Sequence, residues 1–156
     1  MKLLDKLIEL KIDIPEPVAP AGNYVPYKTI DNYIYISGQI PIIGSIASGK
    51  IITGKVPSEV SIQEAQDAAS LCVINTMAIL IAAKDNINCN KINCISLSGF
   101  VNSDNSLTEH PEVINGASNM IYNILGENGK HTRIAVGCAS LPRNACVEVS
   151  SIFYLS

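Results

Sequence analysis

The sequence predicts a two-layer α+β domain in which two long helices cover one face of a mixed β-sheet. Two long stretches carry apolar residues at helical spacing, and about five or six shorter stretches carry the alternation typical of strands. At 156 residues the chain is long enough for one domain with a sizeable core. We expect the second face of the sheet to carry small and polar residues and to be solvated or covered by another subunit.

The first predicted element is a short amphipathic helix over residues 2–11, where leucine and isoleucine recur at helical spacing. Three prolines then exclude a helix up to Tyr24, because proline fixes φ and holds the preceding residue extended. We interpret residues 1–18 as an N-terminal helix and connector, and residues 19–156 as the rest of a single domain. Tyr24 is either a surface aromatic at the core edge or part of a site.

Strands are predicted over residues 27–30 and 33–37, joined by the two-residue turn Asp31-Asn32. The second strand ends at Ser37-Gly38-Gln39, where glycine permits a close backbone approach. A loop follows over residues 43–57, with a short hairpin around 49–54.

The first long helix is predicted from the capping box Ser61-x-x-Glu64 to about Lys84. A strand is predicted over residues 91–101. The second long helix is expected to begin at Pro111, a favoured first position, and to end at Gly126 or Gly129.

The last 25 residues are predicted to form two strands joined by a turn at residues 141–144, a terminal hairpin. Alternation places Arg133, Ala135, Gly137 and Ala139 on one face, which is therefore an arginine followed by small residues that something approaches closely. Glu148 lies in the second strand and could share that pocket. The pair is either a functional site or an ordinary cross-strand ion pair.

Several classes of chemistry lack their motifs. There is no P-loop, GxGxxG, HExxH or GxSxG sequence. We interpret His110 and His131 as solvated or capping residues and the five cysteines, which form no CxxC pair, as reduced and buried. The sequence thus predicts neither a metal site nor a cofactor.

Charge and hydropathy limit the partners. The net charge is −3 and no basic run is present, so nucleic-acid binding is disfavoured. No signal peptide is recognised, and the apolar run over residues 71–83 is too short to span a bilayer. We therefore expect a cytoplasmic protein without a membrane partner. With 47% hydrophobic and only 16% charged residues, an oligomer is favoured over a monomer with an unusually large core.

The remaining chemistry rests on Arg133 and Glu148. An arginine offers a planar fork of donors that matches a carboxylate, and a glutamate can transfer a proton or orient a water molecule. Glycines beside polar residues at 37–39 and 115–116, which we expect in loops, could offer backbone donors to an oxygen that gains charge.

At these residues the sequence resembles the RidA family, also called the YjgF or L-PSP endoribonuclease family. The resemblance rests on Tyr24 after Pro20-Ala-Gly, on the segment Tyr35-Ile-Ser-Gly-Gln-Ile-Pro41, on Asn115, and on Arg133 followed by Leu141-Pro142 and Glu148. It covers about residues 19 to 155.

The resemblance implies a chorismate-mutase-like subunit that assembles as a homotrimer with ligand clefts between subunits. It implies an enamine/imine deaminase that hydrolyses a small imino acid to ammonia and a 2-keto acid. Arg133 would hold the carboxylate and Glu148 would position or deprotonate water. Ser37 and Gly38 would line the cleft, with Tyr24 and Asn115 nearby. Ala135 occupies a position that is often cysteine in the well-studied deaminases.

Two alternatives stay open. The protein could be a non-catalytic or regulatory trimer that binds small carboxylates, a function that Ala135 favours. It could also have the endoribonuclease or translation-inhibitor role attached to the family name, which the acidic composition disfavours.

Overall fold

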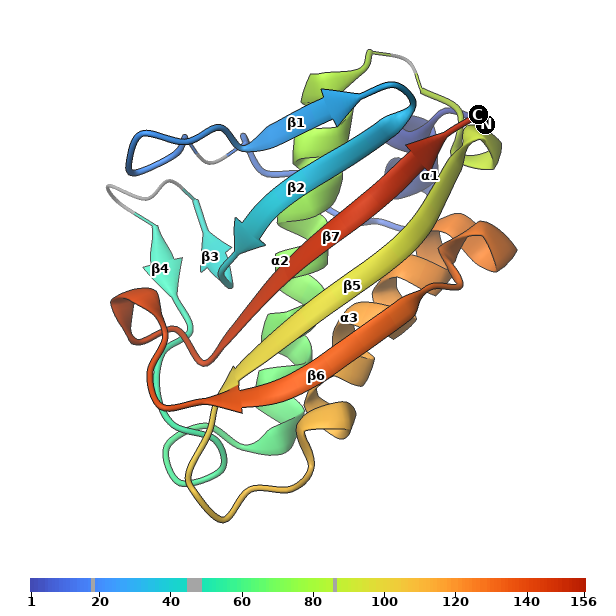
Figure 1. The fold of residues 1–156 in the computed structure, drawn as a ribbon. Helices are drawn as coiled ribbons and strands as arrows, with labels where there is room; N and C mark the ends of the chain where they lie inside the picture. Colours follow the sequence, from blue (N-terminus) through green and yellow to red (C-terminus); the bar gives the residue numbers. More distant parts are fainter. Residues whose placement is uncertain (18, 45–48, 86) are drawn as a thin grey trace.

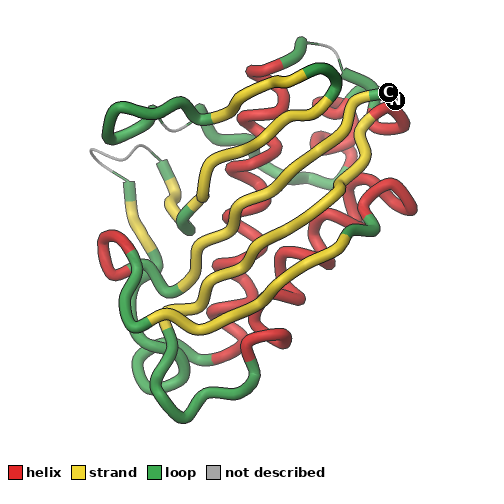
Figure 2. The backbone as a smooth tube through the Cα atoms, in the orientation of Figure 1, coloured by secondary structure: helices red, strands yellow, loops and turns green. Residues whose placement is uncertain are grey.

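The main sheet is covered on one side by helices, as the sequence predicts. The computed structural model describes residues 1–17, 19–44, 49–85 and 87–156. Figure 2 shows the helical segments on one side of the strands. The elements in chain order are α1 (Leu3–Glu9), β1 (Tyr27–Ile30), β2 (Tyr33–Gln39), β3 (Ile42–Ile43), β4 (Lys50–Ile51), α2 (Ile62–Ala83), β5 (Ile92–Asn102), α3 (His110–Leu125), β6 (Thr132–Cys138) and β7 (Val147–Leu155), with short 3₁₀ turns at Cys89–Lys91, Gly126–Gly129 and Pro142–Asn144.

The strand order of the main sheet corrects one prediction. The order is β1-β2-β7-β5-β6, with β6 parallel to β5 and the other pairs antiparallel. The long strand β5 lies between β6 and β7, as Figure 1 shows, so the last two strands do not form a hairpin. The short turn at Pro142–Asn144 joins two strands that pair with the same third strand instead of with each other.

The loop after β2 contains a small second sheet. Ile42 pairs with Ile51 and Ile43 with Lys50, which confirms a short hairpin but shifts it from the expected 49–54. The predicted loop over 43–57 therefore begins inside β3, and residues 45–48 lie outside the described residues.

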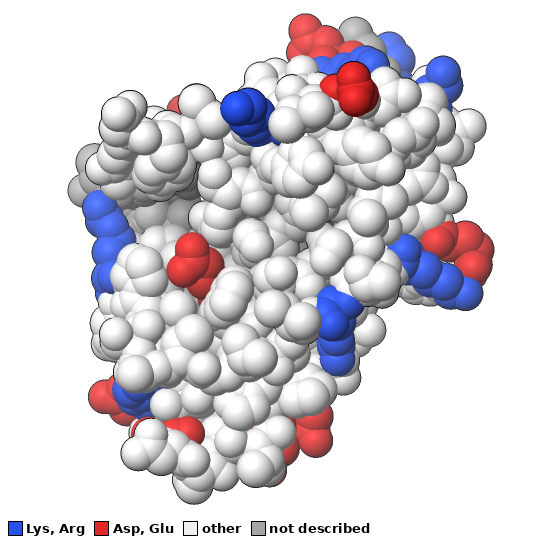
Figure 3. All heavy atoms as spheres, in the orientation of Figure 1, with Lys and Arg blue, Asp and Glu red and all other residues white. Residues whose placement is uncertain are grey.

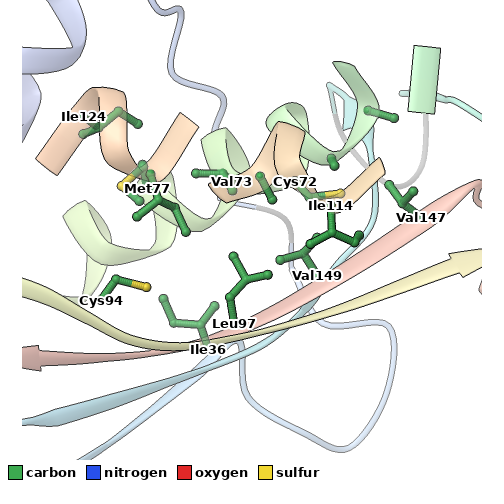
Figure 4. Close-up of a cluster of buried hydrophobic side chains, with 14 of the residues drawn as sticks. Ile36, Cys72, Val73, Met77, Cys94, Leu97, Ile114, Ile124, Val147 and Val149 are labelled. Carbon is green, nitrogen blue, oxygen red and sulfur yellow. The ribbon is translucent and has the colours of Figure 1, made fainter. Parts of the chain in front are cut away.

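The two long helices begin and end close to where the sequence predicts. Ser61 and Glu64 form the expected capping box of α2, and Pro111 lies in the first turn of α3. Gly126, with φ of 59°, ends α3. The core fills the space between helices and sheet, where Figure 4 shows the labelled side chains Ile36, Cys72, Val73, Met77, Cys94, Leu97, Ile114, Ile124, Val147 and Val149.

The helix α2 is long and apolar enough to cross a membrane by length and composition. However, 61% of its most apolar window is buried inside the structure, as is usual for a core helix. A Cβ at Gly116 of α3 would overlap the backbone oxygen of Gln66, so the two helices pack in backbone contact at this point.

The N-terminal helix is integrated with the core. Leu3 and Leu7 are fully buried among the other core residues. The backbone amide of Leu3 donates to the Ile87 carbonyl at 2.8 Å, and that of Cys89 donates to the Met1 carbonyl at 3.0 Å.

The open face of the sheet is more apolar than the sequence analysis predicts. Small and polar residues are present there, but the sheet also exposes large apolar side chains, namely Ile30, Tyr33, Tyr35, Ile95, Ile134 and Val136. Figure 3 shows that this face carries few charged groups. Such a surface is typical of a protein interface.

All five cysteines are free, but only three are buried. Burial raises the pKa of Cys94 to about 12 and that of Cys146 to about 11, and it raises the pKa of Cys72 as well. Cys89 and Cys138 are partly exposed, so the prediction of five buried thiols is wrong for these two.

Candidate functional site

Glu148 lies on the open face of the sheet. Its neighbours Val147 and Val149 are fully buried in the core, so alternation along β7 directs Glu148 to the opposite face. There it borders a cavity of about 150 Å³. The lining residues that the sequence analysis names are Tyr24, Ser37, Gly38 and Glu148, and the others include Ala19, Pro20, Pro26, Ile40, Pro142 and Arg143. We refer to this as the Glu148 cavity.

Hydrogen bonds fix the wall of the Glu148 cavity that β2 provides. The Ser37 hydroxyl donates to the Val25 carbonyl at 2.7 Å, and its backbone amide donates to the Pro26 carbonyl at 3.0 Å. The buried side chain of Asn75 in α2 donates to the carbonyls of Ile40 and Ile42, at 3.1 and 3.3 Å. The end of β2 is therefore held both by the segment that precedes β1 and by the helix layer.

Gly38 provides space for the glutamate. A Cβ at this position would overlap Oε1 of Glu148 and would lie 2.9 Å from its Cδ. Glycine is thus required for the carboxylate to occupy its place, a role that the sequence analysis anticipated as a close approach. Ser37-Gly38-Gln39 belongs to the strand β2 and not to a loop.

The surroundings of Glu148 favour its protonated form. Burial raises the pKa of the Glu148 carboxyl, because partial removal from water disfavours the charged state. A carboxyl with a raised pKa can exchange protons closer to neutral pH than an exposed glutamate can.

Arg133 lies on the other face, toward the helices. It is in register with Leu97 of β5, which is fully buried in the core. Its Nη1 donates to Ser118 Oγ at 3.0 Å and its Nη2 to the Pro111 carbonyl at 3.3 Å, both in α3. These contacts hold the guanidinium against the helix.

A shallow pocket of about 390 Å³ surrounds the guanidinium. Polar groups dominate its lining, which consists of Asn115, Ser118, Asn119, Tyr122, Gly129, Lys130, His131 and Arg133. We refer to it as the Arg133 pocket. Asn115 and Gly116 are inside α3, so the expected loop with free backbone donors at 115–116 is wrong.

The small residues after Arg133 leave space for other segments of the same chain. A Cβ at Gly137 would overlap Ser103 Oγ and lie 2.5 Å from Nε2 of His110. Ala135 is partly buried against the core, beside Gly99 of β5. The close approach that the pattern predicts is therefore made, at Gly137, by Ser103 and His110 of the chain itself.

The structure thus separates the predicted site residues into two groups. Tyr24, Ser37, Gly38 and Glu148 meet on the open face, whereas Arg133 and Asn115 meet beside α3. Arg133 and Glu148 form no cross-strand ion pair, because β5 separates their strands and their side chains leave opposite faces. The expectation that Glu148 shares the pocket of Arg133 is wrong within one chain.

Two residues of the Arg133 pocket were missed or misread. Ser118 could have been identified from its spacing, because it follows Asn115 by three positions and therefore lies on the same helix face. His131 is not simply solvated, because Nδ1 lies 2.6 Å from the Gly129 carbonyl and Nε2 lies 3.0 Å from Ser118 Oγ. Among the described residues, no group of three or more histidines, cysteines or acids could hold a metal ion.

A larger groove of about 1290 Å³ extends along the connector. It lies between residues of the connector, β3 and α2, and its lining is mostly apolar. Ile42 and Arg143 border both this groove and the Glu148 cavity. The groove and the Glu148 cavity therefore share part of their walls.

Comparison with known proteins gives relatives over nearly the whole chain. Trypanosoma cruzi protein TCP17 is 37% identical over 151 residues, covering 96% of this chain and 92% of TCP17. The structure of Atu1372 from Agrobacterium tumefaciens, a protein of unknown function, is 42% identical with a TM-score of 0.85, covering 99% of this chain and 94% of that one.

Two further structures extend the comparison. The structure of a putative endoribonuclease from Shewanella oneidensis has a TM-score of 0.90 at 28% identity, covering 99% of this chain and all of its own. More distantly, E. coli TdcF with bound serine has a TM-score of 0.61 at 25% identity, covering 90% and 94%. The family model "YjgF/chorismate_mutase-like, putative endoribonuclease" matches residues 5–155. The chain therefore belongs to the YjgF/RidA family, and its fold is the chorismate-mutase-like α+β fold of that family.

Proposed function

We propose that the protein is an enamine/imine deaminase that hydrolyses 2-imino acids to 2-keto acids and ammonia. The observation that carries this proposal is that the candidate residues lie in two separate pockets. One pocket holds a fixed guanidinium, and a separate cavity holds a glutamate with a raised pKa. Together these groups can bind a carboxylate and activate water, but only if a second subunit brings them together.

A homotrimer would supply that second subunit. In a cyclic trimer each interface joins two different patches of the same chain, so the Arg133 pocket of one subunit can meet the Glu148 cavity of the next. The exposed apolar side chains of the open face support such an assembly. The site would then lie in a cleft between subunits.

The chemistry follows from the two groups. Arg133 would bind the substrate carboxylate through its planar fork of N–H donors. Glu148 would take a proton from water as the water oxygen bonds to the imine carbon. Returning this proton to the nitrogen would give a carbinolamine. Glu148 would then take the hydroxyl proton of the carbinolamine and pass it to the nitrogen as the carbonyl forms, so that the C–N bond breaks and ammonia and a 2-keto acid leave. The serine bound to TdcF supports a substrate derived from a small amino acid.

The proposal also includes the cellular compartment and the class of substrate. The five free cysteines support a reducing compartment, which we take to be the cytoplasm. The acidic composition supports a small-molecule substrate over RNA, in spite of the endoribonuclease name that the family carries.

The direct test is release of keto acid from freshly generated 2-iminopropanoate. Purified protein should accelerate the release, and both Arg133→Ala and Glu148→Gln should abolish the acceleration. Lys84→Gln is the control, because Lys84 is an exposed cation that lines neither the Arg133 pocket nor the Glu148 cavity, and this change should leave the rate unaltered. No acceleration by the wild type, or unchanged rates in Arg133→Ala, would contradict the proposal.

A second candidate is a trimer that binds 2-keto acids without turnover. Ala135 favours it, because no thiol is present two residues after Arg133. Calorimetry separates the two candidates: saturable binding of pyruvate that Arg133→Ala abolishes, together with no acceleration of imine hydrolysis, would establish the binding protein. Cleavage of RNA by the purified trimer would instead support the endoribonuclease role.

A further inference from the structure

Arg133 is the first member of a chain of three hydrogen bonds along the wall of its pocket. The guanidinium donates to Ser118 Oγ at 3.0 Å, Ser118 Oγ lies 3.0 Å from Nε2 of His131, and Nδ1 of His131 lies 2.6 Å from the Gly129 carbonyl. Three separate elements meet here, because Ser118 comes from α3, Arg133 from β6 and Gly129 from the 3₁₀ turn between them.

The chemistry of its two ends gives this chain a single direction. A carbonyl oxygen can only accept, so Nδ1 of His131 must carry the hydrogen that bonds to Gly129. In the neutral ring Nε2 is then an acceptor, and the Ser118 hydroxyl must donate to it. The remaining capacity of Ser118 Oγ is acceptance, which matches Arg133, a side chain with donors only. All three groups are satisfied in one arrangement.

We propose that Ser118 and His131 are positioning residues that hold the Arg133 guanidinium ready for the substrate carboxylate. This inference rests on the proposed function. An arginine side chain loses considerable rotamer entropy when it binds a ligand, and prior fixation removes that penalty from binding. Within the described chain, Ser118 and Pro111 take up two of its five N–H donors, and the others are left for a ligand.

A nucleophilic role for Ser118 fits the structure less well. The serine–histidine contact has the spacing of a nucleophile and its base. However, Ser118 lies in the middle of α3, where backbone N–H groups are bonded within the helix and cannot stabilise an oxyanion. Its oxygen is also engaged by the arginine. Positioning therefore accounts for both contacts, and nucleophilic catalysis accounts for one.

The first test measures binding of pyruvate by calorimetry. Ser118→Ala and His131→Phe should each weaken binding roughly tenfold, because each interrupts a chain that ends on a charged donor. Ser118→Thr keeps the hydroxyl and should restore most of the affinity. In the Arg133→Ala background, Ser118→Ala should have no further effect, since the positioned group is absent.

The matched control is Ser70→Ala. The Ser70 hydroxyl of α2 donates to the Gly116 carbonyl of α3, so this change perturbs the packing of α3 without touching Arg133. It should leave pyruvate affinity unchanged. Equal affinity of wild type and Ser118→Ala, with binding lost in Arg133→Ala, would overturn the inference and leave the proposed function intact.

A second test does not depend on any ligand. Nitrogen NMR at about pH 8 should find His131 protonated on Nδ1, and rotation of the Arg133 guanidinium should be slow in the wild type and faster in Ser118→Ala. An Nε2-protonated ring or unchanged rotation would overturn the inference even if pyruvate does not bind. Labelling of Ser118 by a fluorophosphonate would overturn it too, by making Ser118 a nucleophile.

Discussion

The Arg133 pocket and the Glu148 cavity differ in the charged group that each contains and in how that group is surrounded. The pocket is shallow and polar, and its cation is held by Ser118 and Pro111. The cavity is smaller, and burial there raises the pKa of Glu148. Burial is the cause of this shift, although Arg143 also lines the cavity. Within one subunit Arg133 and Glu148 lie on opposite faces of the sheet, so each group keeps its own surroundings.

The largest predicted effect is complementation between inactive variants. Arg133→Ala and Glu148→Gln should each abolish imine hydrolysis alone. In trimers that mix the two variants at random in equal amounts, about a quarter of the clefts would combine an intact Arg133 with an intact Glu148 from the next subunit. Activity should therefore return to about a quarter of wild type.

The control for complementation is a mixture of the Arg133→Ala variant with the double variant Arg133→Ala/Glu148→Gln. No cleft in it has an arginine, so it should stay inactive. An equally inactive mixture of the two single variants would show that Arg133 and Glu148 do not act together across subunits.

The second prediction concerns Gly38. Gly38→Ala should reduce kcat/KM for imine hydrolysis roughly a hundredfold, because the methyl group displaces the Glu148 carboxylate from its place. The fold should persist, since the overlapping atoms are at the end of a flexible side chain and Gly38 does not have a positive φ. Pyruvate affinity, measured by calorimetry, should change much less than the rate. An unchanged rate would remove Glu148 from the mechanism.

The sequence identified Arg133 and Glu148, but not that they lie on opposite faces of the sheet and in separate pockets. Local signals identified both long helices, and the alternation of β6 and β7 singled out Arg133 and Glu148. The short turn at Pro142–Asn144 resembles a hairpin connection, and the insertion of β5 between the two strands depends on long-range pairing that no local pattern encodes. The bonds of Ser118 and His131 likewise exist only after α3 packs on β6.

The third prediction compares the stability cost of adding a methyl group at a glycine in the helix layer with the cost at a glycine beside the Glu148 cavity. Gly116→Ala should destabilise the fold by about 1–3 kcal/mol, because the added Cβ would overlap the backbone oxygen of Gln66 and force α2 and α3 apart. Gly22→Ala, in the connector beside the Glu148 cavity, is the control. Its Cβ would only touch the Tyr24 ring at 3.5 Å, an ordinary contact, so stability should change by less than about 0.5 kcal/mol. Urea unfolding measures both.

The smallest predicted effect is a pH-dependent change in stability. Because the folded pKa of Glu148 is raised, its protonated form stabilises the fold at low pH, and this contribution is lost as pH rises through the raised pKa. Glu148→Gln removes the ionised carboxyl and should therefore raise Tm at neutral pH. The gain should disappear below the ordinary glutamate pKa of about 4.3. Thermal unfolding between about pH 4 and pH 8 would measure it.

The same measurement in an Arg133→Ala background tests whether the two groups meet. If the next subunit places Arg133 beside Glu148, its positive charge offsets part of the burial penalty, and the gain from Glu148→Gln at neutral pH is small. Without Arg133 this offset is lost, so Glu148→Gln should raise Tm further in the Arg133→Ala background than in the wild type. Equal gains in both backgrounds would show that the guanidinium and the carboxylate do not interact, and that the Arg133 pocket and the Glu148 cavity remain separate after assembly.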